Sequence, residues 1–230
     1  MHVNGLLIDV DNVLYDSTFW DRWLFKLLNR FGVVGSYLCH ERVWALDYLP
    51  AVNRGLVDYW VALRRYLISV GLTSAQIEEV VAASKIRHAN SLESRRLFPA
   101  ARIALLRLSS ALPITLVANT FETGSQVSSN LRRSGISSNV ASVLTSRDVG
   151  EFMHHEKFLK AALKKMSLRS QVHVGLVSKN SEILAQASQL GLSTIGVAIG
   201  AEMKCDWKFD RFEQLAENLG HQHTNQRMAS

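Results

Sequence analysis

The chain has 230 residues, of which 47% are hydrophobic and 20% are charged, and its formal net charge is +6. This length fits one large domain or one domain with an insertion, and it can bury a sizeable core. The composition excludes collagen-like and low-complexity chains, and two cysteines far apart, Cys39 and Cys205, exclude a disulfide framework or a zinc cluster. Without an apolar run of about 18 residues or a signal-peptide pattern, we expect a cytoplasmic protein with no membrane span.

The positive charge is concentrated in residues 101–170, which hold ten lysines and arginines against four acids and so account for the whole excess. The only aromatic residues in this window are Phe121, Phe152 and Phe158. Nucleic-acid surfaces often combine basic with aromatic side chains, so the pattern argues against nucleic-acid binding. It favours a solvated face or a contact for an acidic partner.

The first element is an apolar run over residues 5–10, which ends in carboxylates and predicts a short buried strand. A helical block follows. Apolar residues recur at helical spacing from Trp20 to Phe31 and again from Leu56 to Val70, and Thr73 with Gln76 forms a plausible capping box. This block predicts a small helical bundle.

From about residue 99 the pattern alternates between helix and strand. We expect helices over 100–111, 125–133, 154–166, 181–190 and 211–219. We expect strands over 113–118, 140–144, 172–177 and 193–197. Alternation of this kind predicts a parallel sheet covered by helices on both faces, to which the first strand also belongs. The expected division is an α/β body of residues 1–16 and 97–220, a helical insertion of residues 17–96 and a disordered tail of residues 221–230.

Polar side chains gather at the ends of the predicted strands, where parallel sheets place ligand chemistry. They are Asp9, Asp11, Asn119, Thr120, Ser178 and Asn180. Two carboxylates two residues apart cost free energy unless a cation or a proton offsets their repulsion. They fit a carboxylate nucleophile with an acid/base partner and a divalent metal between them; the alternative is a surface turn after a strand.

Residues 6–16, Leu-Leu-Ile-Asp-Val-Asp-Asn-Val-Leu-Tyr-Asp, resemble the first motif of the haloacid dehalogenase (HAD) superfamily. The helical insertion is similar to the family's C1 cap. Residues 97–108, 143–150 and 206–219 resemble later parts of the same fold, so the resemblance spans about residues 3–219. It implies a three-layer α/β, parallel-sheet, HAD-like (Rossmann-like) core with an inserted α-helical cap. It also implies that Asp9 is the nucleophile and a metal ligand, while Asp11 is the acid/base and contacts the metal.

The other three motifs depart from the family pattern. Ala118 takes the serine or threonine place of the second motif, which leaves Asn119 and Thr120 as candidates to bind phosphate. Counting back from Phe158 puts Phe152 where the third motif has its lysine. Phenylalanine cannot balance charge, and Lys179 is the candidate to supply the missing ammonium group.

The fourth motif supplies acids as metal ligands in the family. Here its places fall at Lys179 and Ile183, or at Leu176 and Asn180, and none of these is a carboxylate. Residues 177–180 look like the metal-free loop of the true dehalogenases, although those enzymes lack an equivalent of Asp11. We therefore expect Mg²⁺ to be weakly bound or absent.

Two functions follow from this combination. The first is a HAD-like protein with an impaired phosphatase site, acting by binding as a subunit or adaptor in a protein assembly. The alternative is a Mg²⁺-dependent phosphatase or hydrolase of a small phosphorylated metabolite, working through an aspartyl-phosphate intermediate.

Overall fold

A computed structural model describes residues 2–11, 13–16, 18–33, 35–89, 96–136, 142–166, 168 and 173–219. Within these residues a six-stranded sheet has the order β5-β4-β1-β6-β7-β8, and all neighbouring strands are parallel. The strands are β1 (Gly5–Asp9), β4 (Ile114–Ala118), β5 (Ser142–Thr145), β6 (Val174–Ser178), β7 (Ser193–Val197) and β8 (Trp207–Phe209). The expected α/β class is confirmed.

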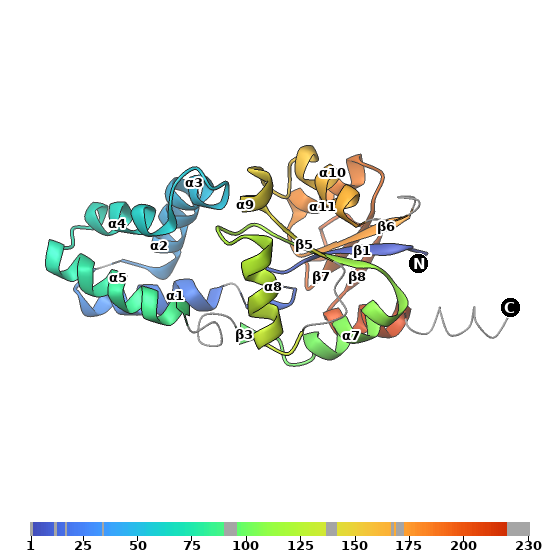
Figure 1. Cartoon of the computed structure of the whole chain (residues 1–230), viewed down its shortest axis with the longest axis horizontal. Helices are drawn as coiled ribbons and strands as arrows, with labels where there is room; N and C mark the ends of the chain where they lie inside the picture. Colours follow the sequence, from blue (N-terminus) through green and yellow to red (C-terminus); the bar gives the residue numbers. More distant parts are fainter. Residues whose placement is uncertain are drawn as a thin grey trace, which may run out of the picture.

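Helices cover both faces of this sheet (Figure 1). They are α7 (Ala101–Ala111), α8 (Gly124–Arg133), α9 (Ser146–Val149), α10 (Glu156–Lys165), α11 (Ser181–Gln189) and a last helix over residues 212–219. Alternate residues of a strand point to opposite faces. Accordingly Leu6 and Ile8 pack with α7, α8 and the last helix, while Leu7 packs with α10 and α11. We call this sheet with its helices the core.

A second group of helices lies to one side of the core and has its own apolar cluster (Figure 1). It contains α1 (Thr18–Arg30), α2 (Tyr37–Val43), the π-helix η1 (Trp44–Tyr48), α3 (Leu49–Asn53), α4 (Tyr59–Ser69) and α5 (Ser74–Ala89). The antiparallel pair β2 (Tyr15–Asp16) and β3 (Arg96–Leu97) joins it to the core. We call this helical group the cap.

The predicted elements agree with the structure to within about two residues wherever both describe the chain. The predicted capping box is present, since the main-chain nitrogen of Thr73 donates to Gln76 and that of Gln76 to the Thr73 hydroxyl. The strand expected from residue 172 begins at Val174, because His173 has a φ of 63° and lies in a turn.

Residues 140, 141 and 172, and the tail 221–230, lie outside the described residues. The division into 1–16 and 97–220, 17–96 and 221–230 stays a prediction. Among the helices that the structure describes, none combines the length and the apolar character needed to span a lipid bilayer.

Candidate functional site

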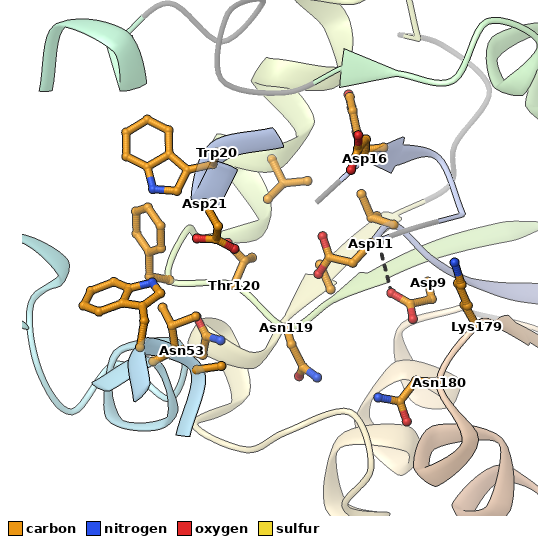
Figure 2. Close-up of a pocket in the computed structure, with 18 of the residues that line it drawn as sticks. Asp9, Asp11, Asp16, Trp20, Asp21, Asn53, Asn119, Thr120, Lys179 and Asn180 are labelled. Carbon is orange, nitrogen blue, oxygen red and sulfur yellow. Dashed lines mark hydrogen bonds between the residues drawn. The ribbon is translucent and has the colours of Figure 1, made fainter. Parts of the chain in front are cut away.

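A pocket of about 730 Å³ lies between the carboxyl ends of β1, β4 and β6 and the helices of the cap. The five site residues predicted from the sequence all line it: Asp9, Asp11, Asn119, Thr120 and Lys179. Figure 2 shows Asp11 between Asp9 on the core side and Asp21 on the cap side. The strand-end residues therefore meet at one place, as the parallel sheet requires, while their chemical roles stay predictions.

Asp9 is the last residue of β1 and is only 4% exposed. The Ser178 hydroxyl donates to Asp9 Oδ2 at 2.7 Å, and the main-chain nitrogen of Asp11 donates to Oδ1 at 3.1 Å. Burial, reinforced by the charge of Asp11, raises the pKa of Asp9 well above its usual range, and these two hydrogen bonds oppose the rise. Both oxygens of Asp9 are thus contacted by donors of the protein itself.

The oxygens at the end of β6 are also engaged. The Ser178 hydroxyl accepts from the main-chain nitrogen of Asn180 at 3.0 Å. Asn180 Oδ1 caps α11 by accepting from the nitrogens of Glu182 and Ile183 at 2.8 and 3.2 Å. Glu182, the acid of this loop, is exposed.

Mg²⁺ needs near-octahedral oxygen ligands, usually with one or two carboxylates. In the part of the chain that the structure describes, no group of three or more His, Cys, Asp or Glu side chains could hold a metal ion. The carboxylates of Asp9 and Asp11 remain, but the β6 end supplies no free oxygen ligand. Asp9 and Asp11 are the residues that would hold Mg²⁺ here, and weak or absent binding of Mg²⁺ stays a prediction.

The places of the second and third motifs hold Ala118 and Phe152, whose side chains carry no hydrogen-bond donor. Ala118 is 2% exposed at the end of β4. Asn119 Oδ1 accepts from the main-chain nitrogen of Met153 at 3.0 Å, so its amide nitrogen is the part left to donate. The Phe152 ring stacks on His154, and Lys157 is 71% exposed beside Glu151.

Lys179 is the one lysine or arginine among the described residues that line the pocket. Its side chain is exposed at the edge of the pocket. Its role in replacing the ammonium group of the third motif stays a prediction.

The cap side of the pocket holds residues that the sequence did not single out as a site. Trp20, Asp21, Glu41, Trp44 and Tyr59 all line it. Burial, together with the charges of Glu41 and Asp11, raises the pKa of Asp21 to about 7. Asp21 lies three and seven residues before the buried Leu24 and Leu28, so it shares the apolar face of α1. An acid on an apolar helix face is the sequence feature that could have indicated Asp21 as a site residue.

The cap also contacts the core beyond the pocket. The buried hydroxyl of Ser146 donates to the main-chain oxygen of Asn53 in α3 at 2.8 Å and accepts from the nitrogen of Thr120 at 2.9 Å. Arg54 Nε donates to the main-chain oxygen of Gly150 at 3.4 Å. These contacts hold α3 against the loops that follow β4 and β5.

No family model matches the sequence, and no curated protein matches it either. Several solved structures are similar in fold. YfnB from Bacillus subtilis, assigned as a HAD-hydrolase and bound to magnesium, has a TM-score of 0.71 at 14% identity, over 95% of this chain and 99% of that one. A protein from Thermotoga maritima assigned as a beta-phosphoglucomutase has a TM-score of 0.70 at 15% identity, over 95% and 99%.

L-2-haloacid dehalogenase from Xanthobacter autotrophicus, with chloropropionic acid covalently bound, has a TM-score of 0.65 at 15% identity, over 94% of this chain and 98% of that one. Identities of this size establish the fold alone. The chain therefore has the fold of the HAD-superfamily hydrolases.

Proposed function

We propose that this HAD-like protein has an impaired phosphatase site and acts by binding, as a subunit or adaptor in a protein assembly. The observation that carries the proposal is the environment of Asp9. Ser178 and the Asp11 nitrogen contact its two oxygens, and the oxygens at the end of β6 are engaged in other hydrogen bonds. Mg²⁺ is then bound weakly or not at all, because these donors compete for the charge of Asp9 and the end of β6 adds no carboxylate.

Loss of phosphate-holding groups supports the same conclusion. Ala118 has no side-chain donor to offer a phosphoryl group, and Phe152 has no charge. Removal of one preorganised electrostatic group from an active site typically lowers the rate by roughly 10²–10³. Several such losses do not simply multiply, but together they leave little catalysis.

The charge of the pocket is a further argument. Its described lining contains five carboxyl groups, from Asp9, Asp11, Asp16, Asp21 and Glu41, against the single ammonium of Lys179. A phosphate dianion entering this pocket meets repulsion from these acids that one ammonium group offsets only in part. Binding of an uncharged or cationic molecule meets no such opposition.

The surface of the cap supports a protein partner. Of the large apolar side chains that are exposed among the described residues, most belong to the cap. They are Leu38, Leu46, Leu56, Val61, Ile68 and Ile86 on the cap, and Phe98 and Ile103 elsewhere. Exposed apolar side chains gathered in one region are a common property of interaction surfaces.

The alternative is a Mg²⁺-dependent phosphatase or hydrolase of a small phosphorylated metabolite. It is favoured by Asp9, Asp11 and Lys179 lying in one pocket. In this reaction an oxygen of Asp9 attacks phosphorus and the ester oxygen leaves with a proton from Asp11. Water, deprotonated by Asp11, then releases phosphate and regenerates Asp9.

Turnover of p-nitrophenyl phosphate with MgCl₂ separates the two functions. The binding function predicts that the wild type and Asp9→Asn release p-nitrophenol at the same background rate. Asp47→Asn, which changes an exposed acid of the cap outside the pocket, is the matched control. Magnesium-dependent turnover that Asp9→Asn abolishes and Asp47→Asn retains would establish the hydrolase instead.

The partner is tested by purification of the tagged chain from its native source. We expect a stoichiometric partner that stays with Asp9→Asn and is lost from a Leu38→Asp, Leu46→Asp variant. A chain that is recovered alone and monomeric contradicts the subunit or adaptor role.

A further inference from the structure

The cap side of the pocket is walled by aromatic rings that hold one another in place. Trp20 Nε1 donates to the Tyr59 hydroxyl at 2.8 Å. The Tyr59 ring stacks on Phe121, with centroids 4.3 Å apart and an angle of 23° between the rings. Trp44 meets Tyr59 edge to face at 5.7 Å. All four residues line the pocket, so the wall is built before any ligand arrives.

Two carboxylates stand in this wall. Asp21 comes from α1 and points into the pocket near Trp20 (Figure 2), and Glu41 comes from α2. Within the described residues, neither side chain has a hydrogen bond or an ion pair. Each lies close enough to the other for their charges to repel. Partly buried carboxylates in this position raise the free energy of the protein unless a cation or a proton joins them.

The missing cation is an organic one rather than a metal ion. No three metal-binding side chains of the described residues come together here, so a bare ion would lack ligands. Aromatic faces, in contrast, attract alkylated ammonium groups, whose charge is spread over a large and weakly hydrated surface. A pocket of about 730 Å³ holds a molecule that carries such a group.

The opposite end of the same pocket is lined by donors. Lys179 contributes an ammonium group, and the Asn119 amide nitrogen is left to donate because its oxygen accepts from Met153. A ligand that is cationic at one end and carries a hydroxyl or an anionic group at the other matches both ends.

We propose that this pocket binds an organic cation, whose alkylated ammonium group lies against the half-buried Trp20 and Phe121, with the buried Trp44 and Tyr59 packed behind them, and is balanced by Asp21 and Glu41. The inference rests on the proposed function in one respect, since it names the class of molecule that the pocket binds instead of hydrolysing. The charge, and not the bulk, of the ligand is what the site recognises.

Choline and 3,3-dimethylbutan-1-ol test this directly, because they differ only in nitrogen against carbon at the centre of the bulky end. Calorimetric titration of the full chain, followed also by tryptophan fluorescence, should give choline at least about tenfold tighter binding than the neutral alcohol. Equal affinities, or no binding of choline, overturn the proposal.

Variants of Asp21 and Trp20 test whether choline binds at the aromatic wall. Asp21→Asn should weaken choline binding about tenfold and leave the neutral alcohol unchanged, whereas Asp47→Asn should change neither. Trp20→Phe keeps a ring and should retain binding, whereas Trp20→Leu should lose it. Choline affinity that is unaffected by both Asp21→Asn and Trp20→Leu places the cation elsewhere and overturns the proposal.

The outcome is independent of the turnover assay. Selective choline binding by a chain that also hydrolyses phosphate esters through Asp9 sustains this inference and contradicts the proposed function. A chain that neither binds choline nor hydrolyses esters contradicts this inference and leaves the impaired site in place.

Discussion

The carboxylates at the two ends of the pocket differ in whether the protein supplies hydrogen-bond donors to them. At the core end, Asp9 is buried and receives hydrogen bonds from the Ser178 hydroxyl and the Asp11 nitrogen. At the cap end, Asp21 and Glu41 repel each other, and no donor among the described residues contacts their side chains. Donors of the protein itself contact the acid at the core end, whereas the described residues supply no such donor to the acids at the cap end.

This difference shows which residues of the pocket come from the parallel sheet and which come from the cap. The parallel sheet brings Asp9, Asp11 and Lys179 to one end of the pocket. The cap supplies Trp20, Trp44 and Tyr59 of the aromatic wall and the acids Asp21 and Glu41. A change on either side should therefore alter one end and spare the other.

The largest expected effect comes from Asp21→Asn on stability. The pKa of Asp21 is about 7 in the folded chain and about 3.9 when unfolded, so the folded state alone keeps the proton between these values. The free energy of unfolding should then fall as pH rises from about 4 to 7 and level off above 7. Asn carries no charge, so the variant should be more stable than the wild type at pH 8, by up to about 4 kcal/mol.

Urea denaturation of both proteins at pH 4.5 and pH 8 measures this difference. Glu41 and Asp11 face Asp21, so the difference between the two chains includes the repulsion among these three acids. A difference in stability that is equal at the two pH values would show that Asp21 does not carry an unbalanced charge.

Ser178→Ala should have the next largest effect, at the other end of the pocket. The substitution leaves the buried Asp9 without one donor and the Asn180 nitrogen without its acceptor. The expected loss of stability is about 1–3 kcal/mol, with a further rise in the pKa of Asp9. Ser109→Ala removes a hydroxyl that contacts only a carbonyl of its own helix, and it should cost clearly less in the same denaturation experiment. Equal costs would mean that Ser178 has no special bond to Asp9.

The smallest expected effect is a gain of metal affinity in Asn180→Asp. Aspartate caps a helix as well as asparagine does, so α11 should stay intact while a carboxylate is added next to Asp9. Calorimetry should show Mg²⁺ binding about tenfold tighter than in the wild type. Asn180→Ser keeps a capping oxygen without the charge and should show no gain. If the wild type already binds Mg²⁺ as tightly as the Asp variant, the core end is not closed to cations.

The core end was predictable because strand ends follow a local rule. An apolar run that stops at a carboxylate marks the end of a buried strand, and parallel strands present such ends along one edge. Asp9, Asp11, Asn119, Thr120 and Lys179 could therefore be expected in one pocket without knowledge of the cap. The hydrogen bond from Ser178 to Asp9 joins residues far apart in sequence, and only the register of β1 with β6 brings them together.

The cap end could not be predicted in the same way. Trp20 belongs to an apolar stripe that a sequence assigns to the interior of a bundle, and here it lines the pocket. The environment of Asp21 depends on how α1 packs against α2, which brings Glu41 near it. Helical periodicity gives the face on which a residue lies but not what another helix places opposite that face.

A carboxyl-carbon NMR titration of Asp9 and Asp21, with Mg²⁺ or choline added in turn, tests the contrast between the two ends most directly. The account predicts that choline lowers the pKa of Asp21 and that Mg²⁺ leaves the pKa of Asp9 unchanged. The account would be contradicted if Mg²⁺ lowered the pKa of Asp9 and choline left the pKa of Asp21 unchanged.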